Sequence, residues 1–453
     1  MVLVSDDDQL LTYIIQKNLD MGEFAPRLMG ILHLSHIQVR VNDSISLRAE
    51  TLIITHLSLS NFRNYASLEL DLPPHITVLQ GDNAQGKSNL LEAIYVLATS
   101  RSPRTYSDRE LINWDAFKDE IPACRITAAV QKAGSNLKLE VALSAKAAAS
   151  PQSPDFFSRW QPSTKGASVL KRIRINGVVR HAVDLIGQLN VVTFSVYDID
   201  LVGGEPALRR RYLDITNSQI DHKYLRNLQR YNRVLWQRNQ LLRLIAENRA
   251  NPDELAFWDG QLVETGAYLT VQRGHTVSTL DRLAQGIHSE LSGEQGKLNL
   301  VYFRSIDKQR GREDSQIKET AEVFQKALLA AREKEMDQGM SLVGPHRDDL
   351  RFFVNEVDAG VYASRGQQRT IALSLKLAEA KFMLDTTKEH PVLLLDDVLS
   401  ELDARRRHHL LGSAANLEQV IITTTDLDRF EQDFLAQASL FRVTQGRIEP
   451  QSA

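Results

Sequence analysis

Residues 76–94 read ITVLQGDNAQGKSNLLEAI, and this stretch decides the fold of the chain. It opens with an apolar run, Ile76–Leu79, that predicts a buried strand. It closes with apolar residues at helical spacing over Leu90–Ile94. Between them, Gly81–Ser88 fits G-x-x-x-x-G-K-[ST] at every fixed position. The order of strand, glycine loop and helix predicts a phosphate-binding loop; the alternative is a glycine turn before an ordinary helix.

The residue types in this loop match the needs of a nucleotide phosphate. Gly81 and Gly86 allow a tight turn whose backbone N–H groups point at phosphate oxygens. The helix that follows presents its N-terminal end to the same anion. Lys87 would place a positive charge on the β- and γ-phosphates, and the Ser88 hydroxyl can ligate Mg²⁺. ATP and Mg²⁺ are therefore the predicted cofactors. The predicted nucleotide-binding residues of the loop are Gly81, Asp82, Asn83, Ala84, Gln85, Gly86, Lys87 and Ser88.

Composition sets limits on the rest of the chain. With 453 residues, 43% hydrophobic and 25% charged, we expect a soluble globular protein of two or three domains. No apolar run reaches the roughly 18 residues of a membrane span. The single cysteine, Cys124, excludes an intramolecular disulfide and fits a reducing cytoplasm. A net charge of −3 means that any surface for nucleic acid must come from local clusters.

The apolar pattern divides the chain into four stretches. Residues 1–51 are weakly patterned and form an N-terminal extension to which we assign no role. Residues 52–202 contain strand patterns and the phosphate loop, and 203–338 switch to helical spacing with dense charge. Residues 339–453 return to alternating strands and helices. We predict an α/β head with a mixed or parallel sheet and an inserted helical lobe. The Ser-, Pro- and Ala-rich residues 145–168 predict a long surface loop.

An acidic pair ends another apolar run. Pro391–Asp397 predicts a buried strand that delivers Asp396 and Asp397 to the carboxyl edge of a parallel sheet. That edge is where open α/β sheets bind ligands. One carboxylate can hold Mg²⁺, and the next can orient or deprotonate an attacking water. The alternative is a strand that ends in an ordinary acidic turn.

A glycine-bearing loop lies one helix upstream of this strand. Ala363–Gln368 precedes a helix predicted over 369–384, and Ser364 and Gly366 could form a second anion site at its start. The alternative is a simple helix cap. The position of the loop before the acidic strand favours the anion site.

In this order the motifs resemble the ABC-type ATPases of the structural-maintenance-of-chromosomes class. They resemble more closely the RecF family of bacterial recombination mediators, and this resemblance covers about residues 52–445. The stretches that carry it are Ser60–Tyr65, Gly81–Asn89, Gly344–Leu350, Ser364–Thr370 and Leu393–Asp403.

The resemblance implies an ABC-type ATPase head that works in pairs. Two copies would sandwich two ATP molecules, with the phosphate loop of one facing Ser364, Gly366 and Gln367 of the other. Asp403 would lie at the seam between them. A short helical second lobe would replace the long coiled coil of the wider class.

The resemblance also implies roles for the acidic pair. Asp396, with Ser88, would hold Mg²⁺; Asp397, with Lys87, would be catalytic, Asp397 as general base. The class usually has Glu where this chain has Asp397, which fits weak turnover. The switch histidine is absent, and Thr423–Asp426 stands in its place. No glutamine is assigned to the usual glutamine loop.

The function that the resemblance implies is ATP-dependent DNA binding in recombinational repair and replication restart, within the SOS response to DNA damage. A dimer induced by ATP would bind DNA at gaps or stalled forks and load recombinase with RecR- and RecO-like partners. We expect at most a weak DNA-dependent ATPase, with hydrolysis as a switch, in the cytoplasm and away from membranes. The alternatives are a transporter ATPase subunit and an overcoming-lysogenization-defect type nuclease. The helical insertion and Phe62–Tyr65 disfavour the first, and no acidic nuclease domain is evident for the second.

Basic clusters are the candidate DNA contacts. Three arginines are spaced i, i+4 and i+7, on one face of a predicted helix, and two lie in the loop after the phosphate-loop helix. Arg209–Arg211 forms a further cluster. Such side chains would meet DNA phosphates with little base readout; the alternative is a solvated face interspersed with carboxylates. The candidate DNA-binding residues are Arg226, Arg230, Arg233, Arg101 and Arg104.

Overall fold

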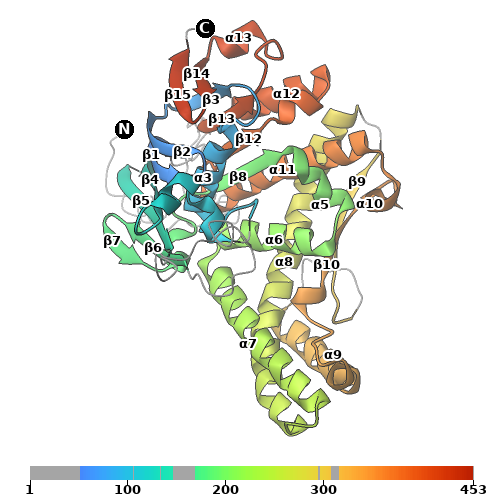
Figure 1. The fold of residues 1–453 in the computed structure, drawn as a ribbon. Helices are drawn as coiled ribbons and strands as arrows, with labels where there is room; N and C mark the ends of the chain where they lie inside the picture. Colours follow the sequence, from blue (N-terminus) through green and yellow to red (C-terminus); the bar gives the residue numbers. More distant parts are fainter. Residues whose placement is uncertain are drawn as a thin grey trace, which may run out of the picture. The chain divides into compact units, whose positions relative to one another are not determined.

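The computed structural model describes residues 51–105, 107–132, 134–145, 169–293, 296–307 and 316–451 (Figure 1). The N-terminal extension, apart from Thr51, and residues 146–168 of the predicted surface loop lie outside this part of the chain.

The described chain is an α/β protein, as predicted. The strands are β1 (Leu52–Phe62), β2 (Tyr65–Asp71), β3 (His75–Gln80), β4 (Ala123–Lys132), β5 (Ser135–Ala145), β6 (Val169–Ile175), β7 (Val178–Arg180), β8 (Val191–Ser195), β9 (Leu298–Phe303), β10 (Asp349–Val354), β11 (Val357–Asp358), β12 (Val392–Asp396), β13 (Gln419–Thr424), β14 (Ala438–Thr444) and β15 (Arg447–Gln451). The helices are α3 (Lys87–Thr99), α4 (Ala182–Leu185), α5 (Asp200–Gly203), α6 (Pro206–Ile220), α7 (His222–Ala246), α8 (Leu255–Ser292), α9 (Ile317–Gln338), α10 (Ala359–Tyr362), α11 (Arg365–Thr387), α12 (Ala404–Ala414) and α13 (Gln432–Leu435).

A mostly parallel sheet positions the nucleotide motifs. Its order is β15-β14-β3-β13-β12-β8, and all strands are parallel except β15 at the edge. In this register Thr423 of β13 lies between Leu79 of β3 and Asp396 of β12. Asp396 in turn pairs with Ser195 of β8 on its other side. The phosphate loop and the acidic pair therefore leave the sheet at the same edge, as the sequence predicts.

An antiparallel sheet covers the phosphate-loop helix from the other side. Its order is β2-β1-β4-β5-β6-β7. Helix α3 is buried along almost its whole length, from Leu90 to Thr99. Its apolar residues pack with the inner face of this sheet and with Leu394 and Ile421 of the parallel sheet in one core. A helix that is apolar on all sides needs such a position between two sheets.

The opposite face of the parallel sheet is covered by helices. These helices and the sheet enclose a second core. Because successive side chains of a strand point to opposite faces, Val78 of β3 packs in this second core and Leu79 packs in the first, with α3. Helices α6 and α11, the second half of α8 and the small sheet β11-β10-β9 complete the second core. Figure 1 shows α11 beside β8 and β12, and α8 running from beside α11 toward the lobe below.

Helices α7, α9 and the first half of α8 form a lobe with its own small apolar clusters. Arg238 lies at its centre, fully buried, and donates to Asp259 and Glu335 at 2.7 Å each and to Ser341 at 2.8 Å. Because α8 runs through both the lobe and the second core, no single residue separates lobe from head. The predicted division at 202/203 and 338/339 stays a prediction.

The two large sheets are joined by one buried amide. Gln419, at the start of β13, accepts from the backbone N–H of Ile54 and donates to its carbonyl oxygen, both at 2.8 Å. It also donates to the carbonyl of Pro73 at 3.2 Å. On its other side β1 pairs with β2 only from His56 onward, so Ile54 lies beyond the end of that ladder and the side chain of Gln419 bonds its backbone there.

Replacing Gln419 by Leu leaves the Ile54 N–H and two carbonyl groups buried without partners. We expect Gln419→Leu to lower the free energy of unfolding by about 2–4 kcal/mol, since each unsatisfied buried group costs about 1–3 kcal/mol. Urea unfolding of this variant beside Gln131→Leu, an exposed glutamine on β4, measures the difference. Equal midpoints for the two variants would contradict this role for Gln419.

Candidate nucleotide site

The backbone of the phosphate loop requires glycine at two positions. Gly86 has φ +118°, and a Cβ there would lie 2.6 Å from Nδ2 of Asn64. A Cβ on Gly81 would lie 2.4 Å from the carbonyl oxygen of Val443. Ala84 also has a positive φ, of 65°. The loop is therefore closely packed on its outer side, and its conformation is fixed by sterics.

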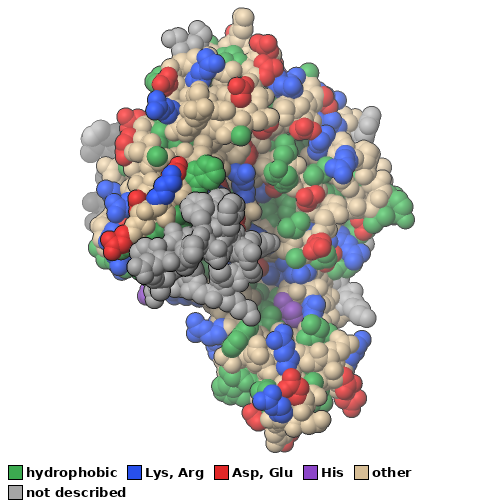
Figure 2. All heavy atoms as spheres, viewed as in Figure 1, with side chains coloured by type: hydrophobic (Ala, Val, Ile, Leu, Met, Phe, Trp, Pro, Cys, Tyr) green, Lys and Arg blue, Asp and Glu red, His purple; other side chains and the backbone are tan. Residues whose placement is uncertain are grey.

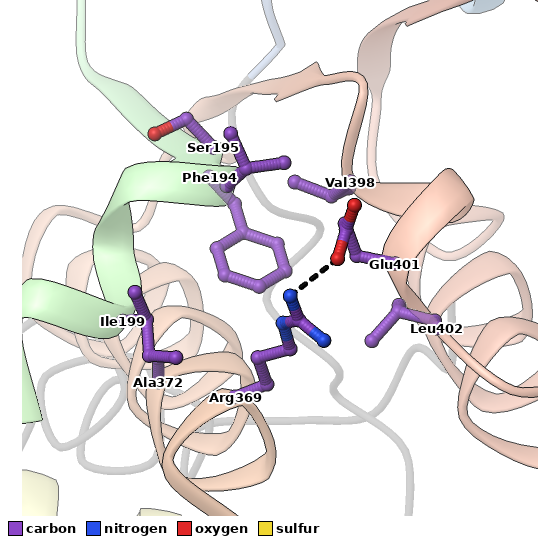
Figure 3. Close-up of a pocket in the computed structure, with 9 residues that line it drawn as sticks. Phe194, Ser195, Ile199, Arg369, Ala372, Val398, Glu401 and Leu402 are labelled. Carbon is purple, nitrogen blue, oxygen red and sulfur yellow. Dashed lines mark ion pairs between the residues drawn. The ribbon is translucent and has the colours of Figure 1, made fainter. Parts of the chain in front are cut away.

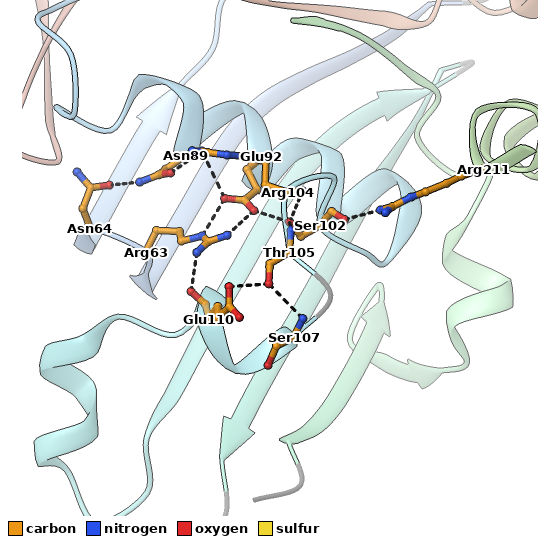
Figure 4. Close-up of polar contacts among 10 residues, drawn as sticks. All are labelled: Arg63, Asn64, Asn89, Glu92, Ser102, Arg104, Thr105, Ser107, Glu110 and Arg211. Carbon is orange, nitrogen blue, oxygen red and sulfur yellow. Dashed lines mark hydrogen bonds and ion pairs between the residues drawn. The ribbon is translucent and has the colours of Figure 1, made fainter. Parts of the chain in front are cut away.

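The turn between β1 and β2 holds the loop from outside. Asn64 donates to the carbonyl of Gln85 at 2.9 Å and accepts from Asn89 at 2.8 Å. The buried Tyr65 hydroxyl donates to the carbonyl of Gly86 at 3.0 Å. The stretch Ser60–Tyr65 is one of those that carry the family resemblance, and the structure shows what this turn contributes. Figure 4 shows Asn64 and Asn89 next to the neighbouring polar network.

That network fixes the basic loop after α3. The carboxylate of Glu92 is wholly buried and pairs with Arg63 through Nε at 2.9 Å and Nη2 at 2.7 Å. Ser102 donates to Glu92 at 2.5 Å, and Arg104 donates to Asn89 at 3.0 Å (Figure 4). The guanidinium of Arg104, predicted to contact DNA, is therefore already held against α3 while its side chain stays half exposed.

Lys87 lies inside the phosphate loop. Only 6% of the residue is exposed, and its Nζ donates to the carbonyls of Gly81 at 2.5 Å and Asp82 at 2.8 Å. Burial lowers the pKa of Lys87, while the charges of Asp397 and Asp396 oppose that shift. The ammonium group therefore lies where the loop backbone and the acidic strand meet, which fits its predicted role on the phosphates.

Ser88, Asp396 and Thr423 form one hydrogen-bonded group across three elements. Ser88 donates to Oδ1 of Asp396 at 2.7 Å, and Thr423 donates to the same oxygen at 2.9 Å. Within the described residues no three His, Cys, Asp or Glu side chains gather as a metal site. Hydroxyl and carboxylate oxygens are the ligands that Mg²⁺ prefers, together with substrate phosphates. Ser88 and Asp396 fit Mg²⁺ on that basis.

Asp397 has an unusual backbone conformation for a residue other than glycine. Its φ is 54°, and its N–H donates to the Thr423 hydroxyl at 3.0 Å. In the described part of the chain, Oδ1 of Asp397 is buried without a hydrogen-bond partner. Burial raises the pKa of this carboxyl, and Lys87 partly opposes the shift. An unpaired carboxylate oxygen held in a strained turn is a candidate general base.

The Ser364 loop is a helix cap. Helix α11 begins at Arg365, four residues earlier than predicted, because Ser364 and Gln367 form a reciprocal capping box. Gln367 therefore lies in the first turn of the helix. Ser364 and Gly366 are exposed, and a Cβ on Gly366 would meet almost open space. Among the described residues no hydrogen bond joins this cap to the phosphate loop, and Figure 1 shows α10, which leads into it, far from α3.

The predicted DNA contacts on α7 are exposed. Arg226 and Arg233 lie on the surface, and Arg230 pairs with Glu264 of α8 at 3.0 Å. Figure 2 shows basic and acidic side chains interspersed on the visible face of this lobe. Arg101 is exposed in the loop after α3.

The cluster at Arg209–Arg211 is structural. Arg209 forms a buried ion pair with Asp349 at 2.7 Å, and Arg210 donates to the carbonyl of Asp348 at 2.9 Å. Arg211 donates to the carbonyl of Ser102 at 2.9 Å. These contacts join α6 to β10 and to the basic loop, so a sequence cluster of arginines here reflects packing between elements.

Comparison with known proteins gives the family. A family model described as the RecF/RecN/SMC N terminal domain matches residues 53–449. The DNA replication and repair protein RecF of Chloroflexus aurantiacus is 45% identical over 402 residues, which cover 87% of this chain and 99% of that protein. The chain belongs to the RecF family. Another RecF-family relative, from Halalkalibacterium halodurans, is 40% identical over 398 residues, which cover 87% of this chain and 99% of that protein.

A solved structure agrees with this assignment. The recombination mediator protein RecF-ATP in the RecFOR pathway matches with a TM-score of 0.75 and 30% identity, over 88% of this chain and 98% of that one. Neither alternative, the transporter subunit or the nuclease, is favoured by these matches. In the described residues no helix is long and apolar enough to cross a bilayer.

Two residues of this RecF-family site had no role in the sequence prediction. The Thr423 hydroxyl donates to Asp396 and accepts from the N–H of Asp397. The one indication of this in the sequence is that Thr423 begins the stretch that stands where the class has its switch histidine. Ser195 lies beside Asp396 at the end of β8. No motif near Ser195 in the sequence indicates a place in the site, because the short apolar run of β8 does not by itself assign the strand to this sheet edge.

Asp397 predicts a pH-dependent effect on stability. Its folded pKa lies above the ordinary value of 3.8, so between the two values the folded chain holds a proton that the unfolded chain has lost. The free energy of unfolding therefore falls as pH rises through this window, and the loss is complete above the folded pKa. Asp397→Asn removes this loss and suits a positive φ. We expect the variant to be up to about 1 kcal/mol more stable at pH 7.

Urea unfolding at a series of pH values measures this effect. The gain from Asp397→Asn should shrink as the pH falls below the folded pKa of Asp397. The matched control is Asp385→Asn, which changes an exposed carboxylate on α11. If the variant were less stable than the natural chain at pH 7, the ionised carboxylate of Asp397 would not be destabilised by its burial, and the prediction would be wrong.

Proposed function

We propose that this chain is an ATP-dependent DNA-binding protein of recombinational repair and replication restart that acts as an ATP-induced dimer in the cytoplasm. One observation carries the proposal. The phosphate loop, Asp396 and Asp397 would form one half of a nucleotide site. The Ser364 cap is exposed elsewhere, and in the part of the chain that the structure describes it makes no hydrogen bond to that half. A second copy is the natural source of the missing half.

The surroundings of Ser364 support a protein interface. The side chains of Val361 and Tyr362, directly before the cap, are 69% and 75% exposed. Large apolar side chains exposed together are typical of interaction surfaces. The cap itself begins a helix of 23 residues, whose N-terminal N–H groups favour an anion. Ser364, Gly366 and Gln367 would thus meet the γ-phosphate of ATP held by the partner copy.

The residues of the phosphate loop and the acidic pair would support slow ATP hydrolysis. Backbone N–H groups of Gly81–Ser88 and the ammonium group of Lys87 would hold the phosphates. When bound, Mg²⁺ held by Ser88 and Asp396 would neutralise charge on the phosphate oxygens. Asp397 would orient an attacking water and accept its proton through the unpaired Oδ1. Its side chain is one methylene shorter than Glu, which fits a weak, DNA-dependent ATPase used as a switch.

DNA binding is proposed through backbone contacts at exposed arginines. Arg226 and Arg233 on α7, together with Arg230, would meet phosphates on one side, and Arg101 and Arg104 would do so beside α3. The relatives' names, DNA replication and repair protein, support DNA as the partner. The RecFOR pathway of the matched structure supports RecR- and RecO-like partners. With these partners the dimer would load recombinase at gaps or stalled forks, as the family resemblance implies.

Two single variants test the shared nucleotide site. Lys87→Ala removes charge from the phosphates and should weaken ATP binding by at least 100-fold without unfolding the chain. Ser364→Arg should leave ATP binding to the single chain unchanged and block ATP-induced dimerisation, because a bulky cation fills the place of the partner's phosphate. Nucleotide titration and sedimentation, each with ATP and with ADP, measure both effects. If Ser364→Arg still dimerises with ATP, the two-copy site is wrong.

DNA affinity should fall steeply with salt, because contacts of Lys and Arg release counterions. Neutralising Arg226, Arg230 and Arg233 together should weaken binding and reduce the slope of log affinity against log salt by about 2–3. The matched control is Arg249→Gln, which removes an exposed charge beyond the end of α7. A triple variant with natural affinity and slope would move the DNA surface to Arg101 and Arg104.

A further inference from the structure

A buried lysine on α11 has no role in the site described so far. Only 8% of the Lys376 side chain is exposed, yet its ammonium group lies 3.1 Å from Glu379 and 3.6 Å from Asp198. It also lies 4.8 Å from the ring centre of Tyr212 on α6. A buried ammonium group costs several kcal/mol unless it is paired. The surroundings of Lys376 are therefore built around its charge.

One of the two carboxylates that pair with Lys376, Asp198, belongs to the sheet edge that carries the nucleotide motifs. Asp198 lies in the short 3-10 turn Val196–Ile199, directly after β8. Its Oδ2 accepts from the N–H of Ser195 at 2.6 Å and from the Ser195 hydroxyl at 3.1 Å, while its Oδ1 faces Lys376. Ser195 in turn pairs in register with Asp396. One carboxylate thus links the strand beside Asp396 to helix α11.

Ser364 is the N-cap of the same helix, and Lys376 lies near its middle. Lys376 lies three helical turns along α11 from that cap, about 18 Å by the rise of an α-helix. Since the helix is continuous and mostly buried, fixing Lys376 fixes the position and rotation of the exposed cap. Glu379 extends the connection, because it accepts from Thr216 of α6 at 2.7 Å.

A second link between α11 and this edge is weaker. Arg369 pairs with Glu401 across a small pocket lined by Phe194, Ser195 and Val398 (Figure 3). Both of its partners are more than a third exposed, so solvent screens that pair. The Asp198–Lys376 pair is mostly buried and is screened much less. It is the stronger determinant of where α11 sits.

We infer that Asp198 and Lys376 are positioning residues that hold the Ser364 cap in register with the Asp396 edge for the shared nucleotide site. This inference rests on the proposed ATP-induced dimer. A buried ion pair contributes little to stability compared with apolar residues of the same size. Its charge and geometry are instead suited to fixing one arrangement of α11 relative to β8.

The test measures two equilibria in the full chain. Asp198→Asn should leave ATP affinity of the single chain within about twofold of the natural chain. It should weaken ATP-induced dimerisation, measured by sedimentation, at least tenfold. Ser195→Ala removes the hydroxyl that donates to Asp198 and accepts from the N–H of Tyr197, but it keeps the backbone bond to Asp198. It should weaken dimerisation several-fold and serves as the milder variant if Asp198→Asn folds poorly. The matched control is Asp259→Asn, which breaks a 2.7 Å pair with Arg238 in the lobe and should leave dimerisation unchanged.

A merely structural role gives a different result. In the triple variant Asp198→Asn, Lys376→Met and Glu379→Gln, no buried charge of this cluster is left unpaired. Thermal stability should return toward that of the natural chain while dimerisation stays weak. Dimerisation that recovers with stability would overturn the positioning role. Asp198→Asn and Ser195→Ala that dimerise like the natural chain would overturn this inference alone. A natural chain that does not dimerise with ATP would overturn the proposed function, and this inference with it.

Discussion

The parallel register of β3, β13, β12 and β8 is the constraint on which the rest depends. Backbone pairing alone brings the end of β3, Thr423, Asp396 and Ser195 to one edge of the sheet. The hydrogen bonds of Ser88 and Thr423 to a single oxygen of Asp396 then fix the group. A shift of one residue between β12 and β13 would turn Asp396 to the other face and dismantle the site.

Around this edge the phosphate loop and helix α3 are each held in place by two independent sets of contacts. The phosphate loop is held by its own glycine geometry and by Asn64 and Tyr65 from the β1–β2 turn. Helix α3 is enclosed by two sheets, which Gln419 joins. Asp397 departs from this pattern, because among the described residues its Oδ1 is buried without a hydrogen-bond partner and its φ is positive. A strained backbone together with an unpaired carboxylate oxygen is typical of a functional position.

The sequence was informative where a motif and its flanks agree. The strand at Ile76–Leu79, the helix after it and the acidic strand were predicted from short apolar runs beside glycine or carboxylate signals. Strand β8 was not, because five residues without a flanking motif cannot be assigned to a sheet. The sequence predicts the start of α11 four residues too late, because Gly366 indicates a loop, whereas the capping box starts the helix at Arg365. The structural role of Arg209 depends on a partner 140 residues away, which no local pattern reveals.

The central claim is that each nucleotide is held by two copies of the chain. Mixing two inactive variants tests it most directly: Lys87→Ala lacks the phosphate lysine, and Ser364→Arg lacks the cap. A heterodimer of the two has one site with both defects and one site with neither. Energy transfer between differently labelled chains should therefore show ATP-dependent pairing in the mixture and none in either variant alone. No pairing in the mixture, or pairing by Ser364→Arg alone, would contradict the claim.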